Sequence, residues 1–284
     1  MKMFKKMLLP ALALMCVTMT ALADFDAGKL INVISREEGS GTRSAFVELT
    51  GVEQKIDGKK VDMTTEDAQI TNNTAVMLTT VAGDAYAIGY VSLGSMNESV
   101  KAVSVEGVAA SAENVASGSY KIARPFNIAY RDDAITELGK DFIAYVMSAE
   151  GQAIVAANGY VAFDSADAYA GSRPQGKLVI AGSSSVSPVM EKLAEAYQAL
   201  NPDAQIEIQT SDSTTGMTAA VDGGCEIGMA SRALKDAEAA QLASVTIAMD
   251  GIAVIVNHEN PVGDLSVEQI GAIYTGDVMS WDEI

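Results

Sequence analysis

The chain has 284 residues, 49% of them hydrophobic, which is enough to bury a large core in one or two domains. It carries 37 acidic against 19 basic residues, for a net charge of −18 at pH 7. This excess of negative charge argues against a nucleic-acid partner, because such a partner requires a basic face.

Residues 1–23 have the pattern of a secretory leader. Three lysines precede an apolar run, and Ala-Leu-Ala at 21–23 fits a signal-peptidase site. Cys16 lies in the run, but Met15 before it fits a lipoprotein processing site poorly. We therefore expect a cleaved, exported protein, with a lipid anchor as the less favoured alternative. Cleavage lowers the net charge from −18 to −21, because it removes three lysines and no acidic residue.

Cysteine and histidine are scarce after the leader. Cys225 is the one cysteine left, so no internal disulfide can form. The one histidine, His258, excludes a zinc site or a catalytic triad built on several histidines. We expect no metal and no cofactor, and we interpret His258 as a surface loop residue.

Apolar runs and amphipathic segments alternate along the chain. The first half predicts a strand at 30–34, a helix at 44–49 closed by Gly51, a polar loop at 51–73, a helix at 74–82, strands at 86–91 and 100–105, a helix at 112–118, an extended segment at 124–130 and one helix at 135–156. The second half predicts a linker at 163–175, a strand at 177–181, a helix at 189–200, a strand at 205–209, a helix at 217–221, strands at 226–230 and 252–256, and a helix at 266–274. This alternation predicts an α/β fold.

Three turns rich in serine, threonine and glycine follow strands and open helices, at 36–42, 182–187 and 211–216. Free backbone N–H groups and the positive end of a helix dipole meet at such a turn and can hold an anion. In the first turn, Arg36 adds a charged fork and hydroxyl donors stand beside it. Ordinary N-capping explains any single turn as well. Three together favour a seat for a small tetrahedral oxyanion at the carboxyl ends of the strands.

Four segments resemble the phosphate-binding proteins of the Pst-type phosphate ABC importers. They are AGSSSVSPVMEKL at 181–193, EIGMASR at 226–232, DGIAVIVN at 250–257 and SREEGSGTR at 35–43. With 273–276 and the region of Trp281, the resemblance covers nearly all of the chain after the leader. It implies a two-lobed periplasmic-binding-protein-like fold of type II, whose lobes are joined by crossing strands and close on the ligand.

The order of these segments differs from that of the family. The segment like 181–193 lies near the amino end in the family, whereas here it stands in the second half of the chain. The chain therefore looks circularly permuted, with the linker at 163–175 joining the family's usual ends and Asp24 near Ile284 in one lobe. A fragment cut from a tandem array is the alternative.

The permutation predicts how the chain divides into lobes. The first lobe is expected to be continuous over 100–257, including the linker at 163–175. The second lobe is expected to combine 24–99 with 258–284.

By the resemblance, phosphate lies between the lobes and is held by backbone N–H, hydroxyl and guanidinium groups. The expected ligand residues are Ser184, Ser185, Ser213 and Ser231 of the first lobe and Arg36, Ser40, Gly41 and Thr42 of the second. Some family members carry an aspartate that accepts the ligand's proton, where this chain has Ser231 followed by Arg232. Asp212 is the candidate for that role, and a helix N-cap is the equal alternative.

Two classes of function remain. The first is a monomeric, periplasmic or extracellular binding protein that hands inorganic phosphate to an ABC-type membrane permease, with sulfate, molybdate or tungstate as alternative ligands. The second is an exported phosphatase with a serine nucleophile, against which the histidine count and the lack of a metal cluster argue.

Overall fold

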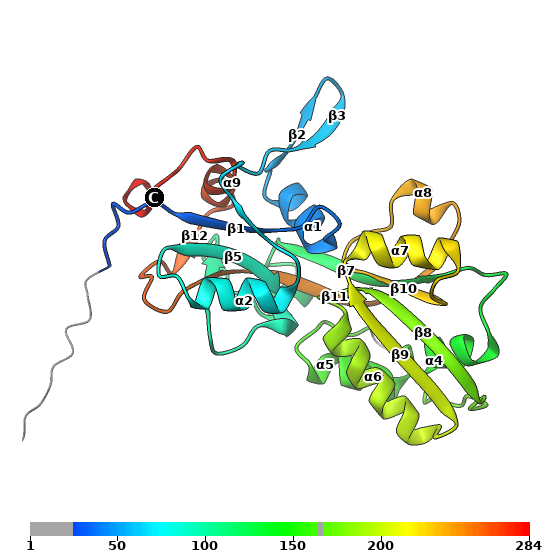
Figure 1. Ribbon diagram of the computed structural model, residues 1–284. Helices are drawn as coiled ribbons and strands as arrows, with labels where there is room; N and C mark the ends of the chain where they lie inside the picture. Colours follow the sequence, from blue (N-terminus) through cyan, green and yellow to red (C-terminus); the bar gives the residue numbers. More distant parts are fainter. Residues whose placement is uncertain (1–24, 164–166) are drawn as a thin grey trace, which may run out of the picture.

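Figure 1 shows the computed structural model of the chain, which describes residues 25–163 and 167–284. The predicted leader at 1–23 lies outside the described residues. The first half forms β1 (Asn32–Arg36), α1 (Gly41–Leu49), β2 (Glu53–Ile56), β3 (Lys59–Asp62), β4 (Gln69–Thr71), α2 (Thr74–Ala82), β5 (Ala87–Ser92), the 3-10 helix η1 (Leu93–Ser95), β6 (Lys101–Val105), α3 (Ala112–Ala116), β7 (Ala123–Tyr130), α4 (Glu137–Val146) and α5 (Ala149–Ala157). The second half forms β8 (Gly176–Ser183), α6 (Ser187–Leu200), β9 (Ala204–Ser211), α7 (Ser213–Asp222), β10 (Ile227–Ala230), α8 (Asp236–Ala239), β11 (Ala243–Val256), β12 (Asp264–Leu265), α9 (Val267–Thr275) and the 3-10 helix η2 (Trp281–Glu283).

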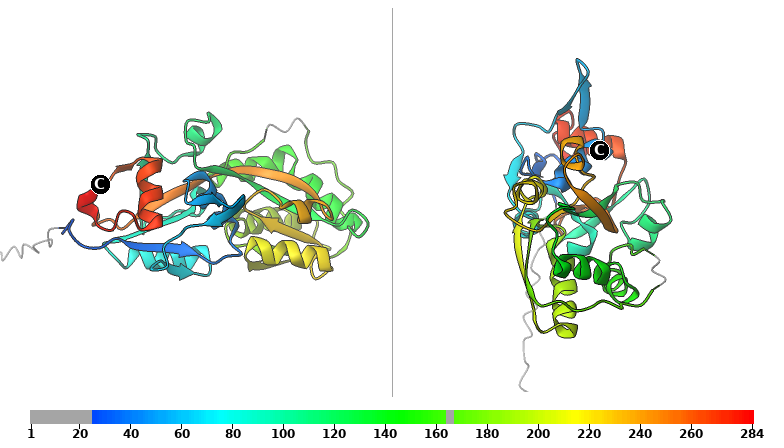
Figure 2. Two further views of the ribbon diagram at one scale, coloured as in Figure 1. Left: turned by 90° about the horizontal axis from the view of Figure 1, so that it is seen from above. Right: turned by 90° about the vertical axis from the view of Figure 1, so that its right-hand side faces the viewer.

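A twisted sheet in the order β4-β1-β5-β11-β7-β10-β8-β9 carries the fold. Its two ends are parallel, with β1 between β4 and β5 on one side and β8 between β10 and β9 on the other. Between them β7 and β11 pair antiparallel, and the long β11, orange in Figures 1 and 2, extends from one lobe into the other. The predicted α/β fold of two lobes joined by crossing strands is confirmed. No helix in the described part of the chain is long and apolar enough to span a bilayer.

Each lobe has its own hydrophobic core, and the crossing strands pass from one core to the other. On β11, Ile247 packs with the first lobe and Ile252 with the second. On β7, Phe126 belongs to the first core, and Ile122 just before the strand belongs to the second. The lobe limits predicted from the sequence stay a prediction, and from this packing we propose a boundary on these strands near Arg124.

Two of the predicted elements differ in kind from the structure. Residues 51–73 are not all loop, because Asp57 and Gly58 adopt positive φ angles of 52° and 78° and join β2 and β3 in a hairpin. This hairpin projects from the body in Figure 1, and its residues are mostly exposed, so it lacks the alternation that marks a strand. The helix predicted at 135–156 is two helices, because Ser148 caps the start of α5 by accepting from the backbone N of Gly151.

The segments near the two ends of the described chain run side by side in the second lobe. The backbone N of Ile31 donates to Met279 O at 2.8 Å, and that of Asp282 donates to Ala27 O at 2.9 Å. This placement agrees with the permutation hypothesis. Asp24, which the hypothesis places near Ile284, lies outside the described residues.

Asp141 of α4 fastens the last part of the predicted linker to the first lobe. Its Oδ2 accepts hydrogen bonds from the hydroxyls of Tyr169 and Tyr197, and its Oδ1 accepts from the backbone N of Ser172 at 2.8 Å. Burial alone would raise the pKa of Asp141, but these hydrogen bonds outweigh it and lower the pKa. The charged carboxylate therefore stabilises the fold.

We expect Asp141→Asn to lower the free energy of unfolding at pH 7 by about 1.5–3 kcal/mol, the usual range for hydrogen bonds to a charged group. The folded pKa lies below the unfolded one, so this stabilisation is present above the unfolded pKa and fades as the pH falls through the folded pKa. Urea unfolding at pH 7 and at about pH 3 measures it. The control is Asp133→Asn, because the Asp133 side chain is 74% exposed. An equal loss at both pH values would contradict the charge argument.

Candidate functional site

A cluster of buried hydroxyl groups lies where the two lobes meet. This hydroxyl cluster consists of Thr42 and Thr74 from the second lobe and Ser183, Ser184, Ser185, Ser213 and Ser231 from the first. None of its members is more than 7% exposed. Hydroxyl groups buried away from water need hydrogen-bond partners, and here they find one another.

The members of the cluster stand at strand ends and helix starts. Ser183 ends β8, and Ser231 follows the last residue of β10. Thr42, Thr74 and Ser213 lie in the first turns of α1, α2 and α7. Since the first N–H groups of a helix have no partner within the helix, three positive helix ends meet at the cluster. Such an arrangement favours an anion.

Hydroxyl contacts cross from lobe to lobe. Thr42 Oγ1 and Ser185 Oγ are 2.8 Å apart, and Thr74 Oγ1 lies 3.3 Å from Ser184 Oγ and 3.4 Å from Ser185 Oγ. Within the first lobe, Ser183 Oγ donates to Ser231 Oγ at 2.9 Å. A hydroxyl rotates its hydrogen freely, so the same groups can turn their donors toward a bound oxyanion.

Arg36 adds a positive charge to the cluster. Its side chain is 2% exposed, and Nη2 donates to Ser184 Oγ at 3.1 Å across the lobe boundary. Glu37 accepts from Nε at 2.8 Å and from Nη2 at 2.7 Å, which fixes the plane of the guanidinium. A guanidinium held in this way is suited to bidentate recognition of an oxyanion.

Of the eight ligand residues predicted from the sequence, six share this cluster: Arg36, Thr42, Ser184, Ser185, Ser213 and Ser231. Gly41 borders it, because a Cβ at Gly41 would lie 2.4 Å from Ser213 Oγ and 2.8 Å from Ser231 Oγ. The hydroxyl of Ser40 caps α1 instead, because its Oγ accepts from Arg43 N at 3.2 Å. Ligand binding by these residues stays a prediction.

Asp212 has the hydrogen bonds of the N-cap alternative. Its Oδ1 accepts from the backbone N of Thr215 at 2.9 Å, and its Oδ2 accepts from the Thr215 hydroxyl at 2.6 Å. It also lies against the other lobe, because a Cβ at Gly39 would approach Asp212 Oδ1 to 2.2 Å. The proton-acceptor role stays a prediction, with both carboxylate oxygens already engaged.

We expect Asp212→Asn to leave the ratio of phosphate to sulfate affinity unchanged within about twofold, because Thr215 already occupies the carboxylate and asparagine caps a helix as well as aspartate does. Isothermal titration calorimetry with each anion measures this ratio. A ratio that falls about tenfold would instead assign the proton acceptor to Asp212, since only phosphate has a proton to give.

Three residues at the site were not singled out in the sequence. Thr74 follows Asn73, which caps α2, so a polar helix start was the available signal. Ser183 and Glu37 lie inside two of the predicted turns. In the described part of the chain, no group of three His, Cys, Asp or Glu side chains is placed to hold a metal ion. His258 is exposed, as predicted, and its Nε2 bonds Glu98 O at 2.8 Å.

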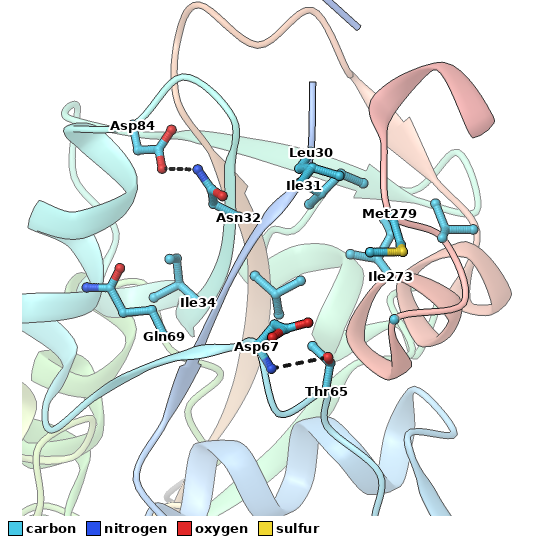
Figure 3. A pocket seen from close by; sticks show the side chains of 13 residues that line it. Leu30, Ile31, Asn32, Ile34, Thr65, Asp67, Gln69, Asp84, Ile273 and Met279 are labelled. Carbon is cyan, nitrogen blue, oxygen red and sulfur yellow. Dashed lines mark hydrogen bonds between the residues drawn. The ribbon is translucent and has the colours of Figure 1, made fainter. Parts of the chain in front are cut away.

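Two cavities differ in their suitability for an anion. One of about 740 Å³ lies between α2 and α6 and adjoins the hydroxyl cluster at Thr74 and Ser184. The other, of about 550 Å³, lies beside β1 and is shown in Figure 3. Its polar lining includes the carboxylates of Asp67 and Asp84, which repel anions. The cavity next to the cluster has one carboxylate in its lining, that of Glu191, beside several hydroxyl and amide groups, so it suits an anion better.

Comparison with known proteins shows that the chain is similar to a family of binding proteins. Residues 18–150 and 167–283 match the family described as the PBP superfamily domain. The chain is 54% identical to the phosphate-binding protein PstS 2 of Streptococcus agalactiae, covering 89% of this chain and 87% of that protein. It is 43% identical to the protein of the same name from Streptococcus pneumoniae, covering 99% of each.

A solved structure supports the fold. The crystal structure of a phosphate ABC transporter, phosphate-binding protein from Streptococcus pneumoniae superposes with a TM-score of 0.71 at 43% sequence identity, covering 90% of this chain and 99% of that one. The Streptococcus pneumoniae relative aligns over nearly its whole length, so the two chains share one order of segments. The permutation relative to other family members stays a prediction.

Proposed function

This chain belongs to the PBP superfamily, in the family of phosphate-binding proteins to which its streptococcal relatives belong, and from that premise we propose that it captures inorganic phosphate between its lobes and delivers it to an ABC permease. The single observation that carries this proposal is the hydroxyl cluster with Arg36, in which both lobes present donors to one buried point. A hydrogen bond to a charged group contributes about 1.5–3 kcal/mol, so four or five such bonds are enough for micromolar affinity.

The proposed ligand groups combine side chains and backbone. They are the guanidinium of Arg36, the helix-start N–H groups of Thr42, Thr74 and Ser213, and the backbone of Ser40 and Gly41. The hydroxyl donors are those of Thr42, Thr74, Ser184, Ser185, Ser213 and Ser231. The anion would replace the hydroxyl–hydroxyl contacts now seen in the cluster. In this set the carboxylate of Glu37 is paired with Arg36 and the other groups are donors, so it suits a fully deprotonated oxyanion as well. Sulfate, molybdate and tungstate are therefore the competing ligands.

The test is a thermal-shift and calorimetric titration of the purified chain with phosphate, sulfate, molybdate and tungstate. At equal concentration, a ligand that binds only the folded state raises the melting temperature more the tighter it binds, because the stabilisation grows with the logarithm of the ratio of its concentration to Kd. We expect phosphate to give the largest shift and a 1:1 calorimetric isotherm. A larger shift with another oxyanion would reassign the ligand, and no shift with any of them would overturn the proposal.

The phosphatase alternative is tested in the same samples. A serine nucleophile needs a neighbouring base, and the only histidine of the chain is exposed and bonded to Glu98. We propose that the chain is not an enzyme and expect no turnover of a chromogenic phosphoester. Metal-independent turnover that is lost in Ser184→Ala would favour the phosphatase.

We propose further that the chain acts outside the cytoplasmic membrane as a monomer after removal of residues 1–23. Intact-mass analysis of the exported protein tests the cleavage site, and light scattering tests the oligomeric state. A lipid on Cys16 would appear as added mass at the new amino end.

A further inference from the structure

Beneath the hydroxyl cluster, the crossing strands carry a buried ion pair that the proposed function does not use. Arg124 of β7 and Asp250 of β11 lie opposite each other in the antiparallel register, and Arg124 Nη2 donates to Asp250 Oδ2 at 2.9 Å. Their side chains are 2% and 0% exposed. A buried pair adds little net stability, because the desolvation of both charges offsets their attraction. Its place in the molecule suggests another role.

Each partner of the pair also holds a strand end from one lobe. Arg124 Nη1 donates to the carbonyl O of Ser231, after β10, at 2.9 Å. Asp250 Oδ1 accepts from the hydroxyl of Ser92, the last residue of β5, at 3.0 Å. Ser231 is central to the hydroxyl cluster, with its Oγ 2.9 Å from Ser183 Oγ. The pair thus fixes the backbone of Ser231 directly behind the hydroxyl that faces the anion seat.

Arg124 also brings a second guanidinium within electrostatic reach of the site. Burial lowers the pKa of Arg124, and the positive charge of Arg36 acts in the same direction, whereas Asp250 raises it. The two arginines are therefore close enough for their positive charges to repel each other. An anion seated beside Arg36 senses both, and Asp250 offsets part of the field from Arg124.

Building on the proposed function, we propose that Arg124 and Asp250 are positioning residues that set the anion affinity of the site. Arg124 orients Ser231 and adds a positive field beneath the anion, and Asp250 limits that field. This role predicts effects of opposite sign when the two charges are removed one at a time.

The test is calorimetric titration of the full chain with phosphate and, separately, with sulfate, for the wild type and two variants. Asp250→Asn nearly keeps the shape and leaves the charge of Arg124 uncompensated, so we expect binding to tighten by about threefold to tenfold. Arg124→Gln leaves the charge of Asp250 uncompensated, and we expect binding to weaken by at least about thirtyfold. A purely structural role predicts that both variants bind more weakly, and that result would overturn the proposal.

A third variant covers the case in which Asp250→Asn does not fold. Arg124→Lys keeps the charge but not the fork of donors, and we expect it to recover at least about tenfold of the affinity lost in Arg124→Gln. Equal affinities of the lysine and glutamine variants would overturn the proposal. The sulfate titration separates the two proposals, because a wild type that binds sulfate alone refutes phosphate capture while the variants still test the pair. A wild type that binds neither anion would overturn both.

Discussion

Arg36→Met is expected to weaken phosphate binding by about 10²–10⁴-fold, because it removes at least two hydrogen bonds to the anion, each about 1.5–3 kcal/mol. Arg36 is the cation that contacts Ser184 and Thr74 in the hydroxyl cluster. Its removal also leaves the carboxylate of Glu37 unpaired beside the anion seat. Methionine keeps most of the volume, so the packing around the strand end is preserved. Isothermal titration calorimetry measures the loss.

Two further variants separate the causes of the affinity lost in Arg36→Met. One tests the unpaired carboxylate of Glu37, and the other is a surface control. The double variant Arg36→Met with Glu37→Gln removes the unpaired carboxylate, and we expect it to bind more tightly than Arg36→Met alone, by about tenfold. The matched control is Arg131→Met, because Arg131 is 39% exposed and pairs with Asp133. An affinity of Arg36→Met within about threefold of the wild type would show that the guanidinium does not contact the ligand.

Gly41→Ala is expected to weaken phosphate binding by at least about tenfold while leaving the unliganded protein as stable as the wild type, or slightly more so. Gly41 is the first residue of α1, a position where alanine suits a helix. An added Cβ would lie 2.4 Å from Ser213 Oγ and 2.8 Å from Ser231 Oγ, and both of those residues belong to the other lobe. The methyl group therefore prevents the lobes from meeting without disturbing either core.

Small-angle X-ray scattering separates failure of the lobes to close from other causes of lost affinity. The wild type is expected to become more compact when phosphate is added, and Gly41→Ala is expected to keep the same radius of gyration. Gly263→Ala is the matched control, because a Cβ there meets no atom within 4 Å. Wild-type affinity and compaction in Gly41→Ala would mean that the lobes do not approach each other at this glycine.

The sequence predicted those residues of the site that belong to a recognisable local pattern. A strand followed by a hydroxyl-rich helix start is a pattern within ten residues, and it brought Arg36 and Ser184 into one hypothesis although 148 residues separate them. Thr74 escaped because a single hydroxyl after a capping asparagine has no glycine to distinguish it from an ordinary helix start. Thr74 lies beside Arg36 because α2 and β1 belong to the same lobe.

The parts of the fold that the sequence left undetermined depend on long-range pairing or on exposure. Arg124 and Asp250 are 126 positions apart, and nothing within either strand reveals the register that makes them partners. The β2–β3 hairpin was missed because both its faces are mostly exposed, so no period-two pattern arises. The break between α4 and α5 depends on one serine, Ser148, whose capping bond competes with a continuous helix.

We infer that the two lobes enclose one tetrahedral anion among hydroxyls, helix-start N–H groups and a guanidinium. The decisive experiment is a crystal structure of the chain grown with phosphate. We expect tetrahedral density within hydrogen-bond distance of Arg36, Thr42 and Ser184, with groups from both lobes in contact. Phosphate bound elsewhere, or held by one lobe alone, would contradict it.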